Sequence, residues 1–177
     1  MTTAIVIVLI ILVAILGLAA MRPNIFSVRR STSIRAKPES IFGLINDFRN
    51  WGSWSPYEKL DPTMRRKLSG AGSGKGAVYE WEGNGKAGAG RMEIIGSTPP
   101  SKVTIKLDFI KPFEGHNTAE FTLEGAGEAG AQTQVTWAMY GPAPYMAKLM
   151  GLFINMDRMI GKDFETGLAN LKAITER

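Results

Sequence analysis

Few side chains in this 177-residue chain could act as catalysts or metal ligands. His116 is the only histidine, and it lies between Gly115 and Asn117, just before a segment with strand periodicity. A histidine base needs a carboxylate or hydroxyl partner that fixes its tautomer, and the sequence assigns none. One histidine and no cysteine cannot build a histidine- or cysteine-based metal site. We therefore favour a solvated turn position for His116, predict no metal and no cofactor, and assign no catalytic residue.

Three glutamates could supply a carboxylate for proton transfer. Glu80 and Glu82 share one face of a predicted strand, and Glu93 lies on the strand expected to pair with it. A carboxylate turned inward would have a raised pKa and could act as an acid or a base. Because Tyr79 and Trp81 alternate with these glutamates and are the natural inward residues, we favour the solvent face for the acids.

Large apolar side chains offer another chemistry, which is contact with an apolar ligand. Tryptophan and tyrosine present flat apolar faces with one polar tip. Trp137 and Tyr140 have opposite parity on one predicted strand, so only one of them faces inward. Aromatic residues also fill the cores of β-rich domains, and both roles stay open at this point. The candidates for lining a cavity are Trp54, Tyr79, Trp81, Phe109, Phe121, Trp137, Met150 and Phe153.

A sheet must position these side chains, because alternation with a period of two governs the chain from Met64 onwards. The glycine-rich segments 70–76 and 83–90 are predicted to be hairpin turns, since neither leads from a strand into a helix as a phosphate-binding loop does. Seven strands are predicted, over residues 25–35, 64–68, 77–82, 90–97, 102–110, 117–123 and 132–140.

Two helices complete the predicted fold of this region. Pro38 and Glu39 begin a short helix with an apolar face that ends near Asn50. The aromatic side chains of the turn-rich segment 51–57 are expected to plug one end of the core. From Leu149 to Ile174 apolar residues recur every three or four positions, which predicts one long amphipathic helix. Because no βα repeat is present, we predict an α+β fold with a curved antiparallel sheet around the C-terminal helix.

The first residues form a separate, uniformly apolar segment. Every residue from Ala4 to Met21 is apolar or glycine. At roughly 1.5 Å per residue a helix of this length spans about 27 Å, close to the thickness of a bilayer core. We predict a transmembrane anchor at 1–22 and a folded domain at 23–177. A cleaved signal peptide is the alternative, but the segment lacks a basic start and is longer than a usual signal core.

The charges that follow the apolar segment predict its orientation. Arg22, Arg29, Arg30, Arg35 and Lys37 come after it with no acidic residue among them. The positive-inside rule then gives a single-pass protein of the inner (cytoplasmic) membrane with its C-terminal domain in the cytoplasm, the alternative being export after signal cleavage. The overall charge of +5 is mild, and the short run 65–67 lacks interleaved aromatics, so we predict no nucleic-acid partner.

Five motifs after the anchor match a known pattern. They are Lys37-Pro38 with Ile41-Phe42 and Ile45-Asn46-Asp47; Trp51 with Trp54-Ser55-Pro56; Gly74 to Trp81 with Gly83-Asn84; Thr133 to Trp137; and Gly161 to Leu171. With these motifs the chain resembles the START-like or Bet v 1-like (SRPBCC) superfamily, and within it the bacterial polyketide cyclase/dehydrase-type proteins. The resemblance implies a helix-grip fold with a deep cavity between sheet and long helix, which relatives use for apolar or aromatic small molecules.

The sequence therefore predicts a membrane-anchored binding domain for an apolar small molecule or lipid, with no strong catalytic machinery. A tether a few residues from the bilayer gives such a cavity ready access to ligands that partition there. Two alternatives stay open. One is a cyclase- or dehydratase-like enzyme that uses a pocket glutamate or tyrosine as acid or base, and the other is a protein-interaction module without a ligand. The residues assign no oligomeric state.

Overall fold

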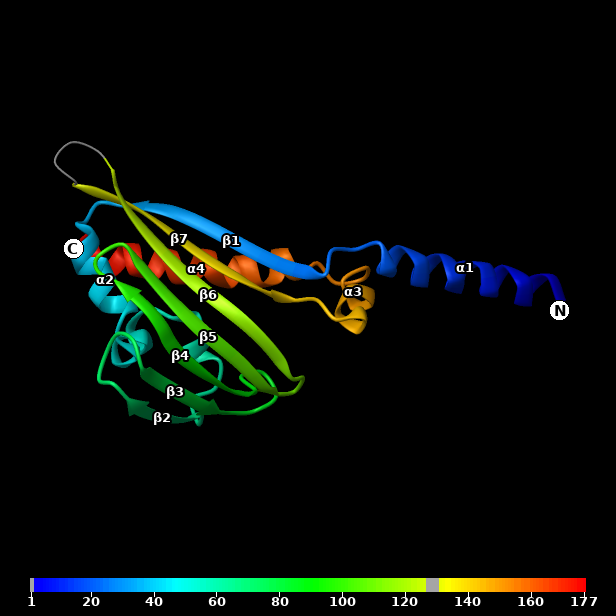
Figure 1. The fold of residues 1–177 in the computed structure, drawn as a ribbon, viewed down its shortest axis with the longest axis horizontal. Coiled ribbons are helices and arrows are strands. Elements are labelled where there is room, and N and C mark those ends of the chain that lie inside the picture. Colours follow the sequence, from blue (N-terminus) through cyan, green and yellow to red (C-terminus); the bar gives the residue numbers. More distant parts are fainter. Residues whose placement is uncertain (1, 127–130) are drawn as a thin grey trace.

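In residues 2–126 and 131–177, which the computed structural model describes, seven strands form one antiparallel sheet around a long helix (Figure 1). The predicted α+β fold is confirmed, because the sheet has the expected seven strands and the chain ends in a long helix. The strands are β1 (Ile25–Ile34), β2 (Arg65–Gly70), β3 (Ala77–Glu82), β4 (Ala89–Thr98), β5 (Lys102–Lys111), β6 (Gly115–Ala126) and β7 (Gln132–Pro142). Their order across the sheet is β1-β7-β6-β5-β4-β3-β2.

The sheet buries one face, as the alternation in the sequence predicts. In β5, Val103, Ile105 and Leu107 are buried, whereas Lys102 and Lys106 are exposed on the opposite face. The register of β4 against β5 shifts at two places, and such irregularities bend and twist a sheet. The inner face of the curved sheet therefore holds the core and faces the C-terminal helix.

The first helix of the folded region is shorter than predicted. The helix α2 (Pro38–Ile45) ends well before Asn50. The carboxylate of Asp47 accepts the backbone N–H of Arg49 at 2.9 Å and starts a 3-10 helix, η1 (Phe48–Ser53). A short acidic side chain that captures backbone N–H groups competes with α-helix continuation, which explains the early end.

The turn-rich segment 51–57 takes 3-10 structure in part and brings its tryptophans into the core. The second 3-10 helix, η2 (Pro56–Lys59), follows η1 directly. The indole N–H groups of Trp51 and Trp54 donate to the carbonyls of Ile45 and Leu44, at 2.9 and 3.1 Å. Both tryptophans are buried. These bonds fix the segment against the end of α2.

The predicted C-terminal helix is two helices. The helix α3 (Tyr145–Met150) stops at Gly151, and α4 (Met156–Thr175) starts after Asn155. The side chain of Asn155 accepts the backbone N–H of Arg158 at 2.9 Å, which is an N-cap hydrogen bond. The apolar period of the sequence runs through this break, so the pattern alone placed the start of the long helix too early.

The edge strand β1 is held against α4 by Arg30. Its guanidinium donates to Asp157 at 3.0 Å and to Glu165 at 2.8 Å, and it lies over the backbone of α4 at Gly161. A Cβ atom on Gly161 would collide with this guanidinium. Arg30 therefore has a packing role in the folded domain, in addition to its place in the basic run after the apolar segment.

The N-terminal helix α1 (Thr2–Ala20) projects away from the sheet at the end where β1 begins (Figure 1). Almost all its described side chains are exposed, whereas Ala19 is buried near the contact with α3. The hydroxyl of Tyr145 in α3 donates to the carbonyl of Leu16 at 2.9 Å. By length and composition residues 3–20 could cross a membrane, which makes α1 a candidate anchor or signal sequence.

Candidate ligand-binding cavity

A cavity of about 1070 Å³ lies between the sheet and α4. Pockets for drug-sized ligands typically measure roughly 300 to 1,000 Å³, so this one is large enough for such a ligand. The sheet lines it with apolar side chains that include Met92, Leu107, Ala119 and Met139. The segment 147–160 lines the opposite side together with part of α4.

The cavity has two ends, which the strand register and α4 define. At the outer end Ile25 of β1 pairs with Pro142 of β7, and the neighbouring Phe153 is 73% exposed. Further in, Val28 pairs with Met139. The inner end is lined by Ser55, Tyr57, Trp137, Asp163 and Phe164. Ser55, Trp137 and Phe164 are at most 3% exposed and Tyr57 and Asp163 are half-buried, so the inner end is more enclosed than the outer end.

Stacked aromatic rings form the inner end. The rings of Trp137 and Phe164 are nearly parallel, with centroids 4.1 Å apart. Tyr57 meets Trp137 edge-on at 6.2 Å. Gly167 permits this packing, because a Cβ atom there would lie 2.7 Å from the Trp137 ring and 3.2 Å from Pro56. The helix, β7 and the segment 55–57 thus meet at one place.

The structure brings five of the eight predicted cavity residues to the cavity wall. Trp137 lies at the inner end and Phe153 at the outer end, and Trp81 and Phe109 face each other edge-on at 5.9 Å. The fifth, Tyr79, is buried beside Trp81, with ring centroids 6.3 Å apart. These five residues come from three strands and the segment before α4.

The other three predicted residues lie elsewhere. Trp54 and Phe121 are fully buried in the core, where Trp54 packs edge-on against both Phe121 and Trp137 at 5.9 and 5.6 Å. Met150 is 44% exposed on α3 and is not among the lining residues. Strand parity placed Phe121 on the inner face of the sheet but could not separate ring packing in the core from an open wall, and the helical period turned Met150 toward the cavity although it is exposed.

One polar cluster on the cavity wall is fully paired. The hydroxyl of Tyr79 donates to Glu58 at 2.6 Å, and the guanidinium of Arg66 donates to the same carboxylate at 2.6 Å. Burial, followed by the hydrogen bond to Glu58, raises the pKa of Tyr79. The sequence analysis did not single out Glu58 and considered Arg66 only within the basic run 65–67, because an acid in a turn and a base in an edge strand carry no local signal of pairing.

A second polar group, at the inner end, is not fully paired. Among the described residues, Ser55 Oγ and Trp137 Nε1 are buried without a hydrogen-bond partner. Burial raises the pKa of Tyr57, and the charge of Asp163 adds to this effect. Burial also raises the pKa of Asp163, against an opposing effect of Lys162. Asp163 did carry a signal, since it is an acid on the apolar face of α4 seven residues after Met156.

The acids and the histidine weighed from the sequence lie on the outside of the sheet. Glu80 pairs with Lys67 at 3.2 Å and Glu93 with Arg91 at 2.8 Å, and Glu82 is half exposed. The predicted solvent face is therefore confirmed for these glutamates. His116 is 63% exposed and lies 2.7 Å from Asp108 on the neighbouring strand, a partner that only the register of the sheet reveals.

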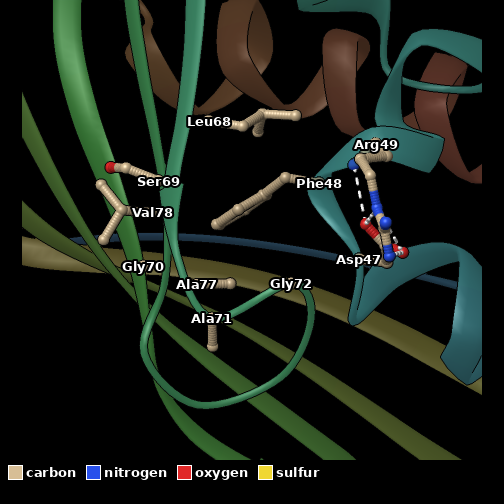
Figure 2. A pocket seen from close by; sticks show the side chains of 10 residues that line it. All are labelled: Asp47, Phe48, Arg49, Leu68, Ser69, Gly70, Ala71, Gly72, Ala77 and Val78. Carbon is tan, nitrogen blue, oxygen red and sulfur yellow. Dashed lines mark hydrogen bonds and ion pairs between the residues drawn. The ribbon is translucent and has the colours of Figure 1, made fainter.

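A second, smaller pocket lies behind the β2–β3 hairpin (Figure 2). Its volume is about 170 Å³, which is below the size of typical ligand sites. Phe48 points from η1 toward the hairpin, and the paired side chains of Asp47 and Arg49 lie to one side (Figure 2). The large cavity is therefore the candidate binding site.

A family model described as "polyketide cyclase / dehydrase and lipid transport" matches residues 26–176. The chain belongs to this family. The match covers all seven strands except the first residue of β1, and the helices α2 to α4, and it begins after the apolar helix α1. This confirms the family resemblance expected from the sequence motifs and supports a ligand-binding domain.

Solved structures share the fold of this family member at low sequence identity. Ginseng (Panax ginseng) major latex-like protein 151 has a TM-score of 0.62 and 12% identity, covering 88% of this chain and 100% of the other. A protein from Chromobacterium violaceum has a TM-score of 0.60 and 14% identity, with 88% and 99% coverage. For the Aha1 dimer from Colwellia psychrerythraea the values are 0.56, 17%, 85% and 96%. No curated protein matches the chain. Similarity at this level shows the helix-grip fold alone.

Proposed function

We propose that this chain is a membrane-anchored binding domain for an apolar small molecule or lipid. The observation that carries the proposal is the cavity of about 1070 Å³, whose wall is largely apolar from Phe153 at the outer end to Phe164 at the inner end. A domain that only binds other proteins has no need to keep such a volume open, because unfilled apolar space destabilises a fold. The family description, which names lipid transport, supports the same reading.

The arrangement of α1 and α3 supports the membrane part of the proposal. The helix α3, which lies beside the outer end of the cavity, packs against the end of α1 through Tyr145 and Leu16. Next to this contact Met146 and Phe153 are 63% and 73% exposed. Exposed apolar side chains beside the end of a spanning helix are stabilised by contact with lipid. In this proposal residues 1–22 are a retained anchor, the folded domain is 23–177, and the outer end of the cavity faces the bilayer.

The test introduces a large side chain into the cavity and compares the amount of bound ligand between the variants and the wild type. Ala119 lines the cavity from β6, so Ala119→Phe places a ring in the space. Ala138 lies on the neighbouring strand β7 with opposite parity to the lining residue Met139, so Ala138→Phe is the matched control. The full chain is released from membranes in lipid nanodiscs, and its ligand is identified by native mass spectrometry and lipid extraction.

We expect a stoichiometric apolar ligand in the wild type and in Ala138→Phe. Ala119→Phe should hold about tenfold less, since overlap with a buried ring costs at least about 1.4 kcal/mol. Equal ligand content in the two variants would contradict binding in this cavity, and an apolar ligand absent from all three proteins would contradict the proposed function.

A second candidate function is an enzyme that transfers a proton in the cavity, in the manner of a cyclase or dehydratase. The observation that favours it is Asp163, a carboxylic acid at the inner end whose pKa burial raises and whose charge acts on Tyr57. An acid that keeps its proton nearer neutral pH is suited to general acid–base catalysis. Loss of water from long-chain β-hydroxy ketones, present in the wild type and abolished by Asp163→Asn, would establish this function.

A further inference from the structure

Two buried polar atoms at the inner end of the cavity lack partners. Within residues 2–126 and 131–177, the indole Nε1 of Trp137 and the Oγ of Ser55 make no hydrogen bond. Both residues are nearly inaccessible from outside, at 3% and 0% exposure, and both line the cavity. A buried donor without an acceptor is costly, and native structures keep few of them.

The same structure pairs comparable groups elsewhere on the cavity wall. The indole N–H of Trp81 donates to the carbonyl of Ala87 at 3.0 Å, and that of Trp51 donates to Ile45 at 2.9 Å. The unpaired state is therefore a property of the inner end and not of cavity tryptophans in general.

The inner end is built from three separated parts of the chain. Trp137 comes from β7, Asp163 from α4, and Ser55 and Tyr57 from the segment around the start of η2. Tyr57 meets the ring of Trp137 edge-on at 6.2 Å, and Ser55 and Asp163 line the same cavity. Their polar groups lie where the apolar wall ends.

The chemistry of these groups selects an uncharged oxygen. An indole N–H only donates, and a hydroxyl can donate or accept, so the group is suited to an oxygen acceptor. The carboxyl of Asp163 can accept a hydrogen bond from a ligand hydroxyl, and its negative charge disfavours an anionic head beside it. The cations that line the cavity lie elsewhere: Arg22 and Lys86 are exposed, and Lys148 contacts Asn24 near the outer end. An anionic head would therefore find no counter-charge at the inner end.

We propose that Ser55, Tyr57, Trp137 and Asp163 form a polar subsite that takes an uncharged oxygen, either hydroxyl or carbonyl, at the leading end of an otherwise apolar ligand. The proposal rests on the proposed binding function and specifies its ligand class. The apolar body of the ligand then extends along α4 toward the outer end, and its oxygen supplies the missing acceptor.

The experiment is a competition between four twelve-carbon probes. The full chain in phosphatidylcholine nanodiscs is captured on a resin and equilibrated with equal amounts of dodecane, dodecan-1-ol, dodecan-2-one and dodecanoate. Gas chromatography measures the excess of each probe over empty nanodiscs. The variants are Trp137→Phe, which keeps a ring against Phe164 but removes the N–H, and Ser55→Ala. The matched control is Trp81→Phe, which removes an indole N–H that is already paired.

We expect the wild type and Trp81→Phe to retain about fivefold or more alcohol and ketone than alkane. One additional hydrogen bond in the bound state accounts for a ratio of this size. Trp137→Phe and Ser55→Ala should each reduce this preference severalfold. Equal retention of alkane and alcohol by the wild type, a preference that both variants keep, or a preference for dodecanoate would overturn the subsite. Equal retention, or a preference that both variants keep, would mean that Trp137 Nε1 and Ser55 Oγ bind only water. If no probe is retained above empty nanodiscs, the proposed binding function itself fails, which is a distinct result.

Discussion

Two aspartates of α4 lie in opposite electrostatic environments although they are less than two turns apart. The hydrogen bond and charge of Arg30 hold the pKa of Asp157 below its usual value. Burial at the cavity raises the pKa of Asp163. An acid whose pKa is lowered by folding stabilises the fold above its unfolded pKa, and an acid whose pKa is raised destabilises it there. One helix thus carries one stabilising and one destabilising carboxylate.

At the residue scale we predict that Asp163→Asn stabilises the fold at pH 7. The cost of Asp163 is fully present above its folded pKa and disappears below the unfolded pKa of about 3.9, so the gain should vanish as the pH falls toward 3.5. Asp157→Asn should destabilise at pH 7 and remain destabilising down to about pH 4, because the stabilising effect of Asp157 is lost only as the pH falls through its lowered folded pKa. Thermal unfolding of the full chain in detergent between pH 3.5 and 7.5 checks both signs. A loss of stability in Asp163→Asn at neutral pH would show that the carboxylate is paired.

At the element scale, close approach of α4 to the sheet depends on Gly167. Elsewhere in a helix, alanine is preferred over glycine by roughly 0.5 to 1 kcal/mol. At Gly167 the added methyl would meet the ring of Trp137, which is stacked against both Phe164 and Phe121. Crowding of this kind costs roughly 1 to 3 kcal/mol and should outweigh the helix preference.

We therefore predict that Gly167→Ala lowers the free energy of unfolding by about 1 kcal/mol. The matched control is Gly43→Ala in α2, where a Cβ atom would meet nothing within 4 Å. It should raise the free energy of unfolding by about 0.5 kcal/mol. Denaturant unfolding followed by tryptophan fluorescence compares the two. A stabilised Gly167→Ala would mean that α4 can move away from the sheet.

The sequence predicted the elements well where one local period governs them. Strands such as β3 and β5 were placed within about one residue, because alternation ends where turn residues begin. The break before α4 was missed, since apolar residues keep the helical period through Gly151 and Asn155. The paired cluster of Glu58 with Arg66 and Tyr79, and the unpaired group at Ser55, arise from contacts between distant segments. The local spacing of residues in the sequence predicts neither the paired cluster nor the unpaired group.

At the scale of the whole molecule, the sidedness of the domain is the main consequence of the proposed anchor. Arg22 follows the apolar helix directly, whereas Arg30 is held by Asp157 and Glu165 in the fold. The orientation inferred from the positive-inside rule therefore depends chiefly on Arg22 and on the other basic residues up to Lys37. We propose a cytoplasmic domain on this basis.

The chain has no cysteine, so single cysteines report the topology without background. Gly72 lies in an exposed turn with no atom within 4 Å of an added Cβ, which makes Gly72→Cys a mild change. In intact cells we expect a membrane-impermeant maleimide to label Thr3→Cys and not Gly72→Cys. After lysis Gly72→Cys should react as well. Labelling of Gly72→Cys in intact cells would place the domain outside and contradict the proposed orientation.

The pairing of β1 with β7 also dictates when the domain can close during synthesis. Ile25, which follows the apolar helix by a few residues, pairs with Pro142 near the end of β7. At typical rates of about 5 to 20 residues per second, the ribosome needs roughly 6 to 25 s to make the chain between them. Throughout that interval β1 lacks its complete neighbouring strand, and Asp163 is added later still. The inner end of the cavity can therefore form only after nearly the whole chain has been synthesised.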